Sequence, residues 1–313
     1  MVIAEIRADI DAIERDPSLY DAVSFGRRAA ALDSIEFDVI DRIQGLLGTT
    51  TTPPDTLIEL ERCAERVRRR LAAIDRRMFR RLRAEIRAGR CAGRALRTVI
   101  DESVECDVVG GRRRDEPGYD HLDAFVNGLL LTRPIPVETK AREPEMVRYQ
   151  QTPARVIFEL VDRARLAGDD VFYDLGSGLG HVPILVNLLS GATARGVEFE
   201  PAYCDYARAR AADLKLSRVA FTNADARAAD YSDGTVFFLY TPFVGAMLDE
   251  VLERLRRLSR RRRIRLFTYG PCTPWVARQG WLESPDGERH HAFRLAAFTS
   301  RPANATRAAM TGG

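Results

Sequence analysis

The sequence predicts an α/β protein: a mostly parallel sheet with helices on both faces, preceded by an all-helical N-terminal domain. From Thr152 onward, short apolar runs alternate with segments of helical length, which is typical of parallel sheets. Before residue 110, apolar residues recur at spacings of three and four, the period of a helix. The 313 residues suffice for two domains, and 45% hydrophobic with 30% charged residues is a globular balance.

The N-terminal domain is predicted over residues 1–110 as a helical bundle. A first isoleucine stripe is followed by an apolar segment over 19–47, which we expect to break near Ser34, and then by a turn-rich linker. From Leu57 to Met78 the apolar residues again alternate at three and four, which indicates the seam of a bundle or short coiled coil. Such a seam would also allow a homodimer through the N-terminal helices.

Arginine carries almost all of the basic charge. Of the 48 basic residues only Lys140 and Lys215 are lysines, and fourteen arginines lie between Arg62 and Arg97. We interpret the arginine-rich stretch 61–97 as a solvated helix face, because the arginine excess runs through the whole chain. The alternative is a basic surface for nucleic acid or an acidic partner.

Cysteine and histidine usage gives no sign of a disulfide framework or a metal site. The five cysteines are odd in number, scattered and without a CxxC pair, and the four histidines lack metal-ligand spacing. No apolar run approaches a membrane span, and acidic residues interrupt the N-terminal stripe, unlike a signal peptide. We therefore expect no metal, no membrane association and a reducing, cytoplasmic location.

Residues 111–151 are predicted to form a connecting arm or substrate lid. The glycine- and arginine-rich loop over 106–119 separates the two halves of the chain. A short helix over 122–131 and a proline-spaced stretch then lead to the next domain.

The domain over 152–300 is predicted to hold five consecutive strands and a terminal hairpin, with a frayed tail over 301–313. The expected helices are 153–166, 179–189, 201–214 and 244–258; the expected strands are 171–175, 194–199, 218–222, 235–240 and 264–269, and the hairpin pairs 280–284 with 290–300.

The most informative stretch is VFYDLGSGLG, residues 171–180, in which a buried strand ends in Asp174 and a glycine turn opens a helix. Glycines at alternate positions allow positive φ and close approach of a ligand, and this edge of an α/β sheet is where ligands bind. The spacing of Gly176, Gly178 and Gly180 differs from that of dinucleotide sites, and no P-loop lysine follows. The alternative interpretation is a tight turn without a ligand.

Two further acids fall at the same predicted edge. Glu198 ends the second strand, where a carboxylate can hold a ribose diol. Asp225, in Asn223-Ala224-Asp225-Ala226, follows the third strand and could accept a hydrogen bond from an exocyclic amine such as that of adenine. The alternative is that both are solvated acids at strand ends.

DLGSGLG, GVEFEP and NADA, in this order, resemble the class I S-adenosylmethionine-dependent methyltransferases over residues 149–300. The resemblance implies a Rossmann-like seven-stranded sheet and S-adenosylmethionine as the cofactor. It implies that Asp174 orients the cofactor's amino group, Glu198 holds the ribose and Asp225 the adenine. The remaining residues it implies for cofactor binding are Gly176, Ser177, Gly178, Gly180 and Ala226.

The segment RYQQTP, residues 148–153, offers Thr152 as an N-cap and Pro153 at the first helical position. It is similar to the pre-cofactor segment of the non-SET histone-lysine methyltransferases of the telomeric-silencing type and of mitochondrial lysine methyltransferases. This resemblance implies that Tyr149 and Thr152 lie in a loop that covers the cofactor and lines a lysine channel.

Tyr240-Thr241-Pro242-Phe243 follows the fourth strand, where amino-group methyltransferases often have Asn, Asp or Ser, two prolines and an aromatic residue. The difference from this pattern favours Tyr240 and Phe243 as apolar walls of a channel. The alternative for these two residues and for Tyr149 is that they only pack in the core or the arm. We therefore expect methyl transfer to an amine such as a protein lysine. A small-molecule N- or O-methyltransferase, a cofactor-binding interaction protein without turnover and an RNA methyltransferase are the alternatives.

Overall fold

The computed structural model describes residues 2–48, 55–104, 119–287 and 291–302. The described residues fall into two compact units. Unit 1 lies within residues 1–91, 95–111 and 119–132, and unit 2 is formed chiefly by residues from 133 onward. The predicted linker over 49–54, all but the last residue of the predicted loop over 106–119 and all but the first two residues of the predicted tail over 301–313 lie outside the described residues.

Unit 1 is helical, as predicted. Its helices are α1 (Val2–Arg15), η1 (Pro17–Tyr20), α2 (Phe25–Ser34), η2 (Ile35–Ile40), α3 (Asp41–Gly48), α4 (Asp55–Arg87), α5 (Arg94–Val104) and α6 (His121–Leu130). The helix break expected near Ser34 is not found. The backbone instead changes there to the π-helical segment η2, which continues directly into α3. A single π turn absorbs extra residues without ending a helix. The short helix α6, predicted as part of the arm, belongs to unit 1.

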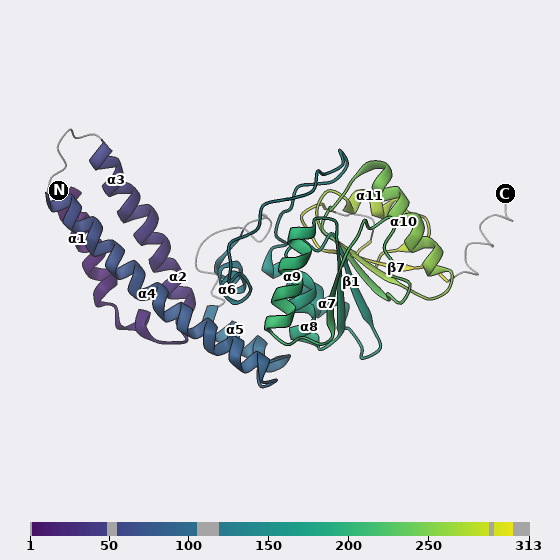
Figure 1. Ribbon diagram of the computed structural model, residues 1–313, viewed down its shortest axis with the longest axis horizontal. Helices are drawn as coiled ribbons and strands as arrows, with labels where there is room; N and C mark the ends of the chain where they lie inside the picture. The colour runs from purple at the N-terminus through teal and green to yellow at the C-terminus, as the bar shows by residue number, and fades with distance from the viewer. Residues whose placement is uncertain (1, 49–54, 105–118, 288–290, 303–313) are drawn as a thin grey trace. The chain divides into compact units, whose positions relative to one another are not determined.

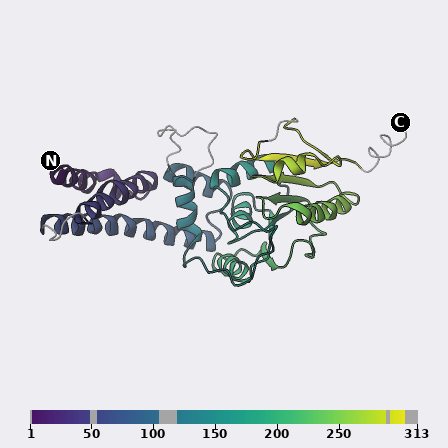
Figure 2. The ribbon, with the colours of Figure 1, turned by 90° about the horizontal axis from the view of Figure 1, so that it is seen from above.

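The predicted seam of α4 is the core of unit 1. Helix α4 runs the length of this unit (Figure 2), and its apolar stripe packs against α1 and η2. The buried seam residues are Leu57, Leu60, Ala64, Val67 and Leu71. Because these side chains are buried within one chain, this stripe is not an open surface for a second copy.

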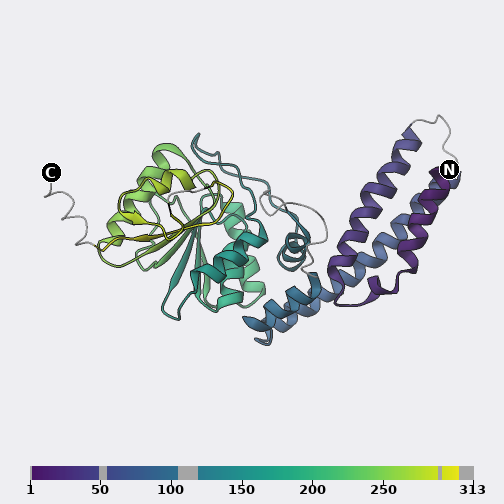
Figure 3. The same ribbon diagram turned by 180° about the vertical axis from the view of Figure 1, so that it is seen from behind.

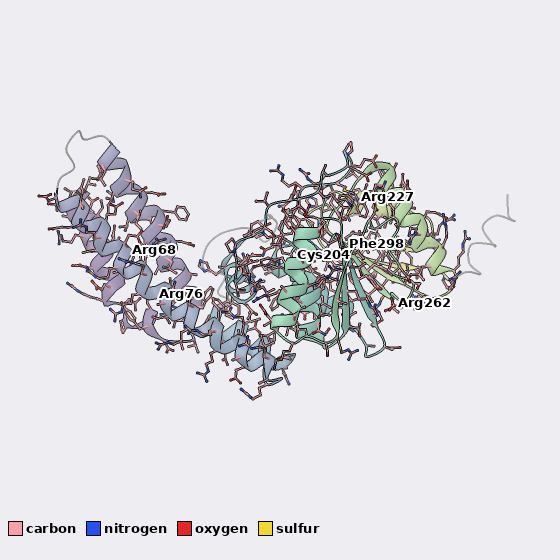
Figure 4. All side chains as sticks on the ribbon, in the orientation of Figure 1. Arg68, Arg76, Cys204, Arg227, Arg262 and Phe298 are labelled. Carbon is pink, nitrogen blue, oxygen red and sulfur yellow. The ribbon has the colours of Figure 1, made fainter. Side chains whose placement is uncertain are left out.

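Beyond Leu71 the α4 core becomes polar and then aromatic. Asp75 accepts a hydrogen bond of 2.6 Å from Arg28, whose fully buried guanidinium also donates to the carbonyls that end η1. Phe79 then packs edge-to-face against Phe25 and Phe125. Arg68 and Arg76 of α4 are labelled in Figure 4: Arg68 is half-buried and pairs with Glu36 of η2 and with Glu65, whereas Arg76 is exposed, as expected for a solvated arginine-rich face.

Unit 2 contains the predicted alternation of helices and strands. Its helices are α7 (Ala154–Ala164), α8 (His181–Ser190), α9 (Pro201–Asp213), α10 (Gly245–Ser259) and α11 (Thr273–Ala277). Its strands are β1 (Val171–Leu175), β2 (Thr193–Glu198), β3 (Val219–Asn223), β4 (Val236–Leu239), β5 (Arg265–Thr268), β6 (Leu282–Glu283) and β7 (Ala296–Ser300). The short helix α11 was not predicted.

The strands form one seven-stranded sheet in the order β3-β2-β1-β4-β5-β7-β6, which confirms the predicted Rossmann-like fold. Strands β1 to β5 are parallel, and β7 is antiparallel to both β5 and β6, so the predicted hairpin closes one edge. Helices α7, α8 and α9 cover one face and α10 and α11 the other (Figure 1). The parallel order brings the carboxyl ends of β1, β2, β3 and β4 to a common edge.

Residues 133–149 form the arm of unit 2, an extended segment with almost no regular secondary structure. Figure 3 shows this segment, between α6 and α7, reaching the end of the sheet next to α10 and α11. Its last residues bridge to the loop after β4: Met146 pairs with Phe243, and the Val147 amide donates to the Pro242 carbonyl at 3.0 Å. The arm therefore lies against the edge at which the predicted site residues end their strands.

Candidate active site

The glycine turn after β1 has the left-handed backbone that its sequence requires. Gly176, Gly178 and Gly180 have φ of 93°, 51° and 84°. A Cβ at Gly176 would lie 2.3 Å from Pro242, and one at Gly178 would lie 2.2 Å from a ring carbon of Tyr149. The two glycines therefore let a proline and a tyrosine lie directly on the turn, which the sequence did not indicate. Gly180 allows close packing against Phe221 of β3.

Asp174 and Glu198 form a buried acidic pair beneath this turn. Asp174 is 3% exposed, and burial followed by the charge of Glu198 raises its pKa well above the usual range. Burial also raises the pKa of Glu198, although its carboxylate accepts hydrogen bonds from the amides of Gly178 at 2.6 Å and Glu200 at 2.8 Å. Two neighbouring buried carboxyl groups favour a cationic or hydrogen-bond-donating ligand.

Asp225, after β3, is the third acid at this edge and is held differently. Its carboxylate accepts from the guanidinium of Arg227 at 2.6 Å, and Arg227 also pairs with Glu143 of the arm at 2.6 Å. The hydrogen bond from Arg227 keeps the pKa of Asp225 below its ordinary value, so this acid is ionised. Its neighbour Ala226 is buried. Arg227, labelled in Figure 4, therefore links the arm to the sheet edge.

Glu200 and Glu145 fasten the arm to two helix N-termini. Glu200 caps α9 by accepting from the Ala202 amide, and it also accepts from the Thr139 hydroxyl at 2.6 Å and the Lys140 amide at 2.9 Å. Although burial raises it, the hydrogen bonds lower the pKa of Glu200 to about 2. Glu200 therefore both caps α9 and holds the arm.

Glu145 lies in the arm and caps α10 from outside that helix. Its carboxylate accepts from the amides of Ala246 at 3.1 Å and Met247 at 2.8 Å. A carboxylate at a helix N-terminus satisfies free amides and interacts favourably with the helix dipole. No local sequence pattern indicates this cap, because the acid and the helix are about a hundred residues apart.

A cavity of about 400 Å³ lies between the arm and the sheet edge. This volume is within the range of small-molecule sites, roughly 300–1,000 Å³. Of the predicted site residues, the cavity is lined by Tyr149, Gly176, Glu198, Asp225, Ala226, Tyr240 and Phe243. Tyr203, which packs on Tyr149 with ring centroids 5.3 Å apart, also lines it and was not predicted.

Five of the residues predicted to bind the cofactor do not line the cavity. They are Thr152, Asp174, Ser177, Gly178 and Gly180. Tyr149 covers Gly178 in this structure, so the ring stands between part of the glycine turn and the cavity. Ser177 is 5% exposed, and its hydroxyl has no hydrogen-bond partner among the described residues.

The predicted capping role of Thr152 is wrong. Pro153 is the N-cap of α7, with φ −55° and ψ 134° and no side-chain cap, and its carbonyl accepts from the Val156 amide at 2.9 Å. The helix therefore begins one residue later than predicted. Thr152 itself is buried.

The loop after β4 is strained at Thr241, which has φ +38°. Its hydroxyl oxygen accepts from the Cys272 amide at 3.1 Å, which fixes the loop against the turn before α11. The neighbouring Tyr240 packs on Tyr269 with centroids 5.1 Å apart, and Phe243 is 5% exposed beside Met146 of the arm. A non-glycine residue with positive φ costs free energy and is often found at functional sites.

His181, at the start of α8, does not line the cavity. Burial lowers its pKa to about 4, and neither ring nitrogen has a hydrogen-bond partner among the described residues. It is therefore a neutral buried side chain. In the part of the chain that the structure describes, no cluster of His, Cys, Asp and Glu has the arrangement of a metal site. Among the same residues, none of the helices is both long and apolar enough to span a membrane.

Comparison with known proteins gives one family match. Residues 145–239 match the family described as histone methylation protein DOT1. This range begins in the arm, includes the glycine turn and all three acids, and ends with β4. No curated protein matches the chain in a sequence search.

Solved structures with similar folds include several methyltransferases. An RNA methyltransferase from Salinibacter ruber in complex with S-adenosyl-L-homocysteine has 23% identity and a TM-score of 0.37, over 49% of this chain and 95% of that one. A precorrin-6y C5,15-methyltransferase from Geobacter metallireducens has 20% identity and a TM-score of 0.38, over 50% and 93%. A geranyl diphosphate C-methyltransferase from Streptomyces coelicolor has 23% identity and a TM-score of 0.31, over 37% and 43%. The acceptors in these names belong to those proteins.

The sheet order, the glycine turn, the acids at its carboxyl edge and the family match together define a class I S-adenosylmethionine-dependent methyltransferase. The chain is an enzyme of this class, and S-adenosylmethionine is its cofactor. The cofactor carries an ammonium, a ribose diol and an adenine amine. Glu198 and Asp225 line the cavity and can accept hydrogen bonds from such a group, whereas Asp174 is buried outside the cavity lining in this structure.

Proposed function

We propose that this methyltransferase transfers its methyl group to the side-chain amine of a protein lysine. The observation that carries the proposal is the match of residues 145–239 to the family described as histone methylation protein DOT1. The matched region includes Tyr149, which lies on the glycine turn and lines the cavity.

The cavity wall also suits an amine acceptor. S-adenosylmethionine supplies an electrophilic methyl group, so the protein has to bring a neutral amine lone pair in line with it and exclude water. The new N–C bond forms as the S–C bond breaks, and the product ammonium then releases a proton. Tyr149, Tyr240 and Phe243 offer aromatic faces, which accommodate both a neutral amine and the cation formed.

We propose separate roles for the three acids. Asp174 pairs with the ammonium of the cofactor, Glu198 holds the ribose, and Asp225 accepts from the adenine amine beside Ala226. Gly176, Ser177, Gly178 and Gly180 form the turn against which the methionine part packs, and Thr152 supports the loop above it. The arm then acts as the substrate lid, held in place by Glu145 and Glu200.

Labelled-methyl transfer tests the acceptor. Purified protein with labelled cofactor is incubated with a cell lysate and with purified histones, and labelled species are identified by mass spectrometry. We expect label on lysine side chains and none with Asp174→Ala. Label confined to RNA or small molecules would contradict a lysine acceptor. Label on any acceptor that is insensitive to Asp174→Ala would contradict the site assignment.

We also propose a reducing, cytoplasmic location. The five cysteines are scattered along the sequence. The four that the structure describes, Cys63, Cys91, Cys204 and Cys272, are all free thiols. Such use of cysteine is typical of reducing compartments.

A further inference from the structure

Four large apolar side chains are exposed in or near the cavity lining: three line the cavity and the fourth lies on the neighbouring helix α11. Val147 is 44% exposed, Val244 40%, Trp275 41% and Phe293 43%. Val147, Val244 and Phe293 also line the cavity, and Trp275 belongs to α11, which begins just after the lining residue Pro271. We call these four residues the apolar rim.

The apolar rim is assembled from segments that are distant in sequence and tied together by hydrogen bonds. The arm joins the start of α10 through the Val244 amide, which donates to the Glu145 carbonyl at 2.9 Å. Trp275 donates from its indole nitrogen to Asp249 of α10 at 2.6 Å. Phe293 packs on Tyr269, and the Gly270 amide donates to the Ala292 carbonyl. The exposed side chains are therefore held on a fixed backbone.

On the arm, the charges beside the apolar rim do not favour a basic ligand, although the carboxylate of Asp249 on α10 lies next to Trp275. Each nearby carboxylate of the arm is already engaged: Glu138 with Arg142, Glu143 with Arg227, and Glu145 with the α10 amides. By contrast, Arg148 lines the cavity, and its side chain has no carboxylate partner among the described residues. Lysine or arginine residues next to an acceptor would meet this free positive charge.

We propose that the apolar rim binds a large apolar side chain that flanks the methylated lysine in a polypeptide acceptor. An apolar patch of this kind, continuous with a site, marks a binding surface. The inference rests on the proposed lysine acceptor and narrows it: the substrate segment is apolar rather than a basic tail. A second copy of this chain and a small apolar amine are the other occupants that the experiment must distinguish.

Synthetic peptides with a single central lysine test the inference. One set carries leucine or phenylalanine at the positions within four residues of the lysine, a second carries serine and a third arginine. We expect kcat/KM to be about 10-fold or more higher for the apolar set than for the serine set, because burying such a side chain contributes that much binding. The arginine set should be the poorest acceptor.

Variants of the apolar rim test whether this surface causes the preference for apolar peptides. Val147→Ser, Val244→Ser and Phe293→Ser should raise KM for the apolar peptides and reduce their advantage over the serine set. Val137→Ser is the matched control, because Val137 is 84% exposed on the same arm and does not line the cavity. Val244 is the N-cap position of α10, where serine is well tolerated.

The outcomes separate this inference from the proposed function. Transfer to lysine peptides without an apolar preference, or with a preference that the rim variants leave intact, overturns the inference alone. Transfer to none of the lysine peptides and to no protein lysine contradicts both. If sedimentation shows a dimer that Val244→Ser and Phe293→Ser dissociate, the rim is a contact between copies and the inference fails.

Discussion

Gly178 shows why the glycine turn tolerates little change at single positions. Its φ of 51° is unfavourable for other residues, and a Cβ would lie 2.2 Å from the ring of Tyr149. We expect Gly178→Ala to displace the ring and to weaken cofactor binding at least about 10-fold, beyond a backbone cost of about 1 kcal/mol. Titration calorimetry gives the affinity, and denaturant unfolding gives the stability.

Gly191 provides the matched control for this prediction. It ends α8 with φ 74°, and a Cβ there would meet no atom within 4 Å. Gly191→Ala should therefore show a similar loss of stability with unchanged cofactor affinity. Equal losses of affinity in the two variants would show that backbone strain, and not the contact with Tyr149, controls binding.

Asp174 predicts a pH dependence with a defined sign. Burial and the charge of Glu198 raise its pKa in the folded protein, so the folded state keeps a proton that the unfolded state releases. The protonated Asp174 therefore contributes fully to the free energy of unfolding at a pH below its pKa in the unfolded chain. This contribution is lost as the pH rises through its pKa in the folded protein. We expect stability of the cofactor-free protein to fall with rising pH over this interval, and Asp174→Asn to remove part of the fall.

The same group predicts proton release when the cofactor binds. An ammonium beside Asp174 favours the carboxylate, so binding should expel the proton held in the free protein. Calorimetry in buffers of different ionisation enthalpy measures this release. Asp174→Asn should abolish it, whereas Asp225→Asn should weaken binding and leave the release intact, because Arg227 keeps Asp225 ionised. Equal release in the wild type and Asp174→Asn would contradict the assignment.

At the scale of elements, the arm is held to the sheet domain by Glu145, which lies in the arm and caps α10. Glu145→Ala removes the carboxylate that caps α10, and we expect a loss of about 1 kcal/mol in unfolding free energy. Hydrogen exchange over residues 142–149 should become faster, and kcat should fall. Glu283→Ala, which removes a largely exposed ion pair with Arg263, should change none of these quantities measurably. Unchanged exchange in Glu145→Ala would show that other contacts hold the arm.

The sequence pattern predicted helices and strands well where they contain runs of buried apolar residues. The five parallel strands, the helices between them and the terminal hairpin lie close to their predicted positions, because alternation of strand and helix leaves few other topologies. The five-residue helix α11 escaped prediction, since one turn of helix has no measurable period. The π segment η2 escaped because its residues continue a helical pattern.

Apart from Tyr149, which a family resemblance indicated, the predicted residues that line the cavity lie at or after the ends of strands. Asp174, Glu198 and Asp225 were placed at one edge by topology alone. The contact of Tyr149 with Gly178 and the cap from Glu145 to α10 join positions far apart in sequence, so no local pattern could reveal them. The apolar rim could not be predicted for the same reason, because its residues come from four segments that are far apart in sequence.

At the scale of the whole molecule, the two units have separate cores. Phe25, Phe79 and Phe125 pack edge-to-face in unit 1, with centroids 5.1–5.4 Å apart, and Phe125 is fully buried. The residues that we propose to bind the cofactor all belong to unit 2. We therefore expect scanning calorimetry of the full chain to show two unfolding transitions.

The two transitions should respond to different changes. Phe125→Ala should destabilise unit 1 by about 3–5 kcal/mol and lower one transition only. Cofactor at 100 times its Kd should stabilise unit 2 by about 2.7 kcal/mol and raise only the other. Phe37→Ala is the matched control, because Phe37 is 66% exposed on η2 and its loss should move neither transition. A single transition that both Phe125→Ala and the cofactor shift would show that the helical unit and the methyltransferase unit unfold as one cooperative body.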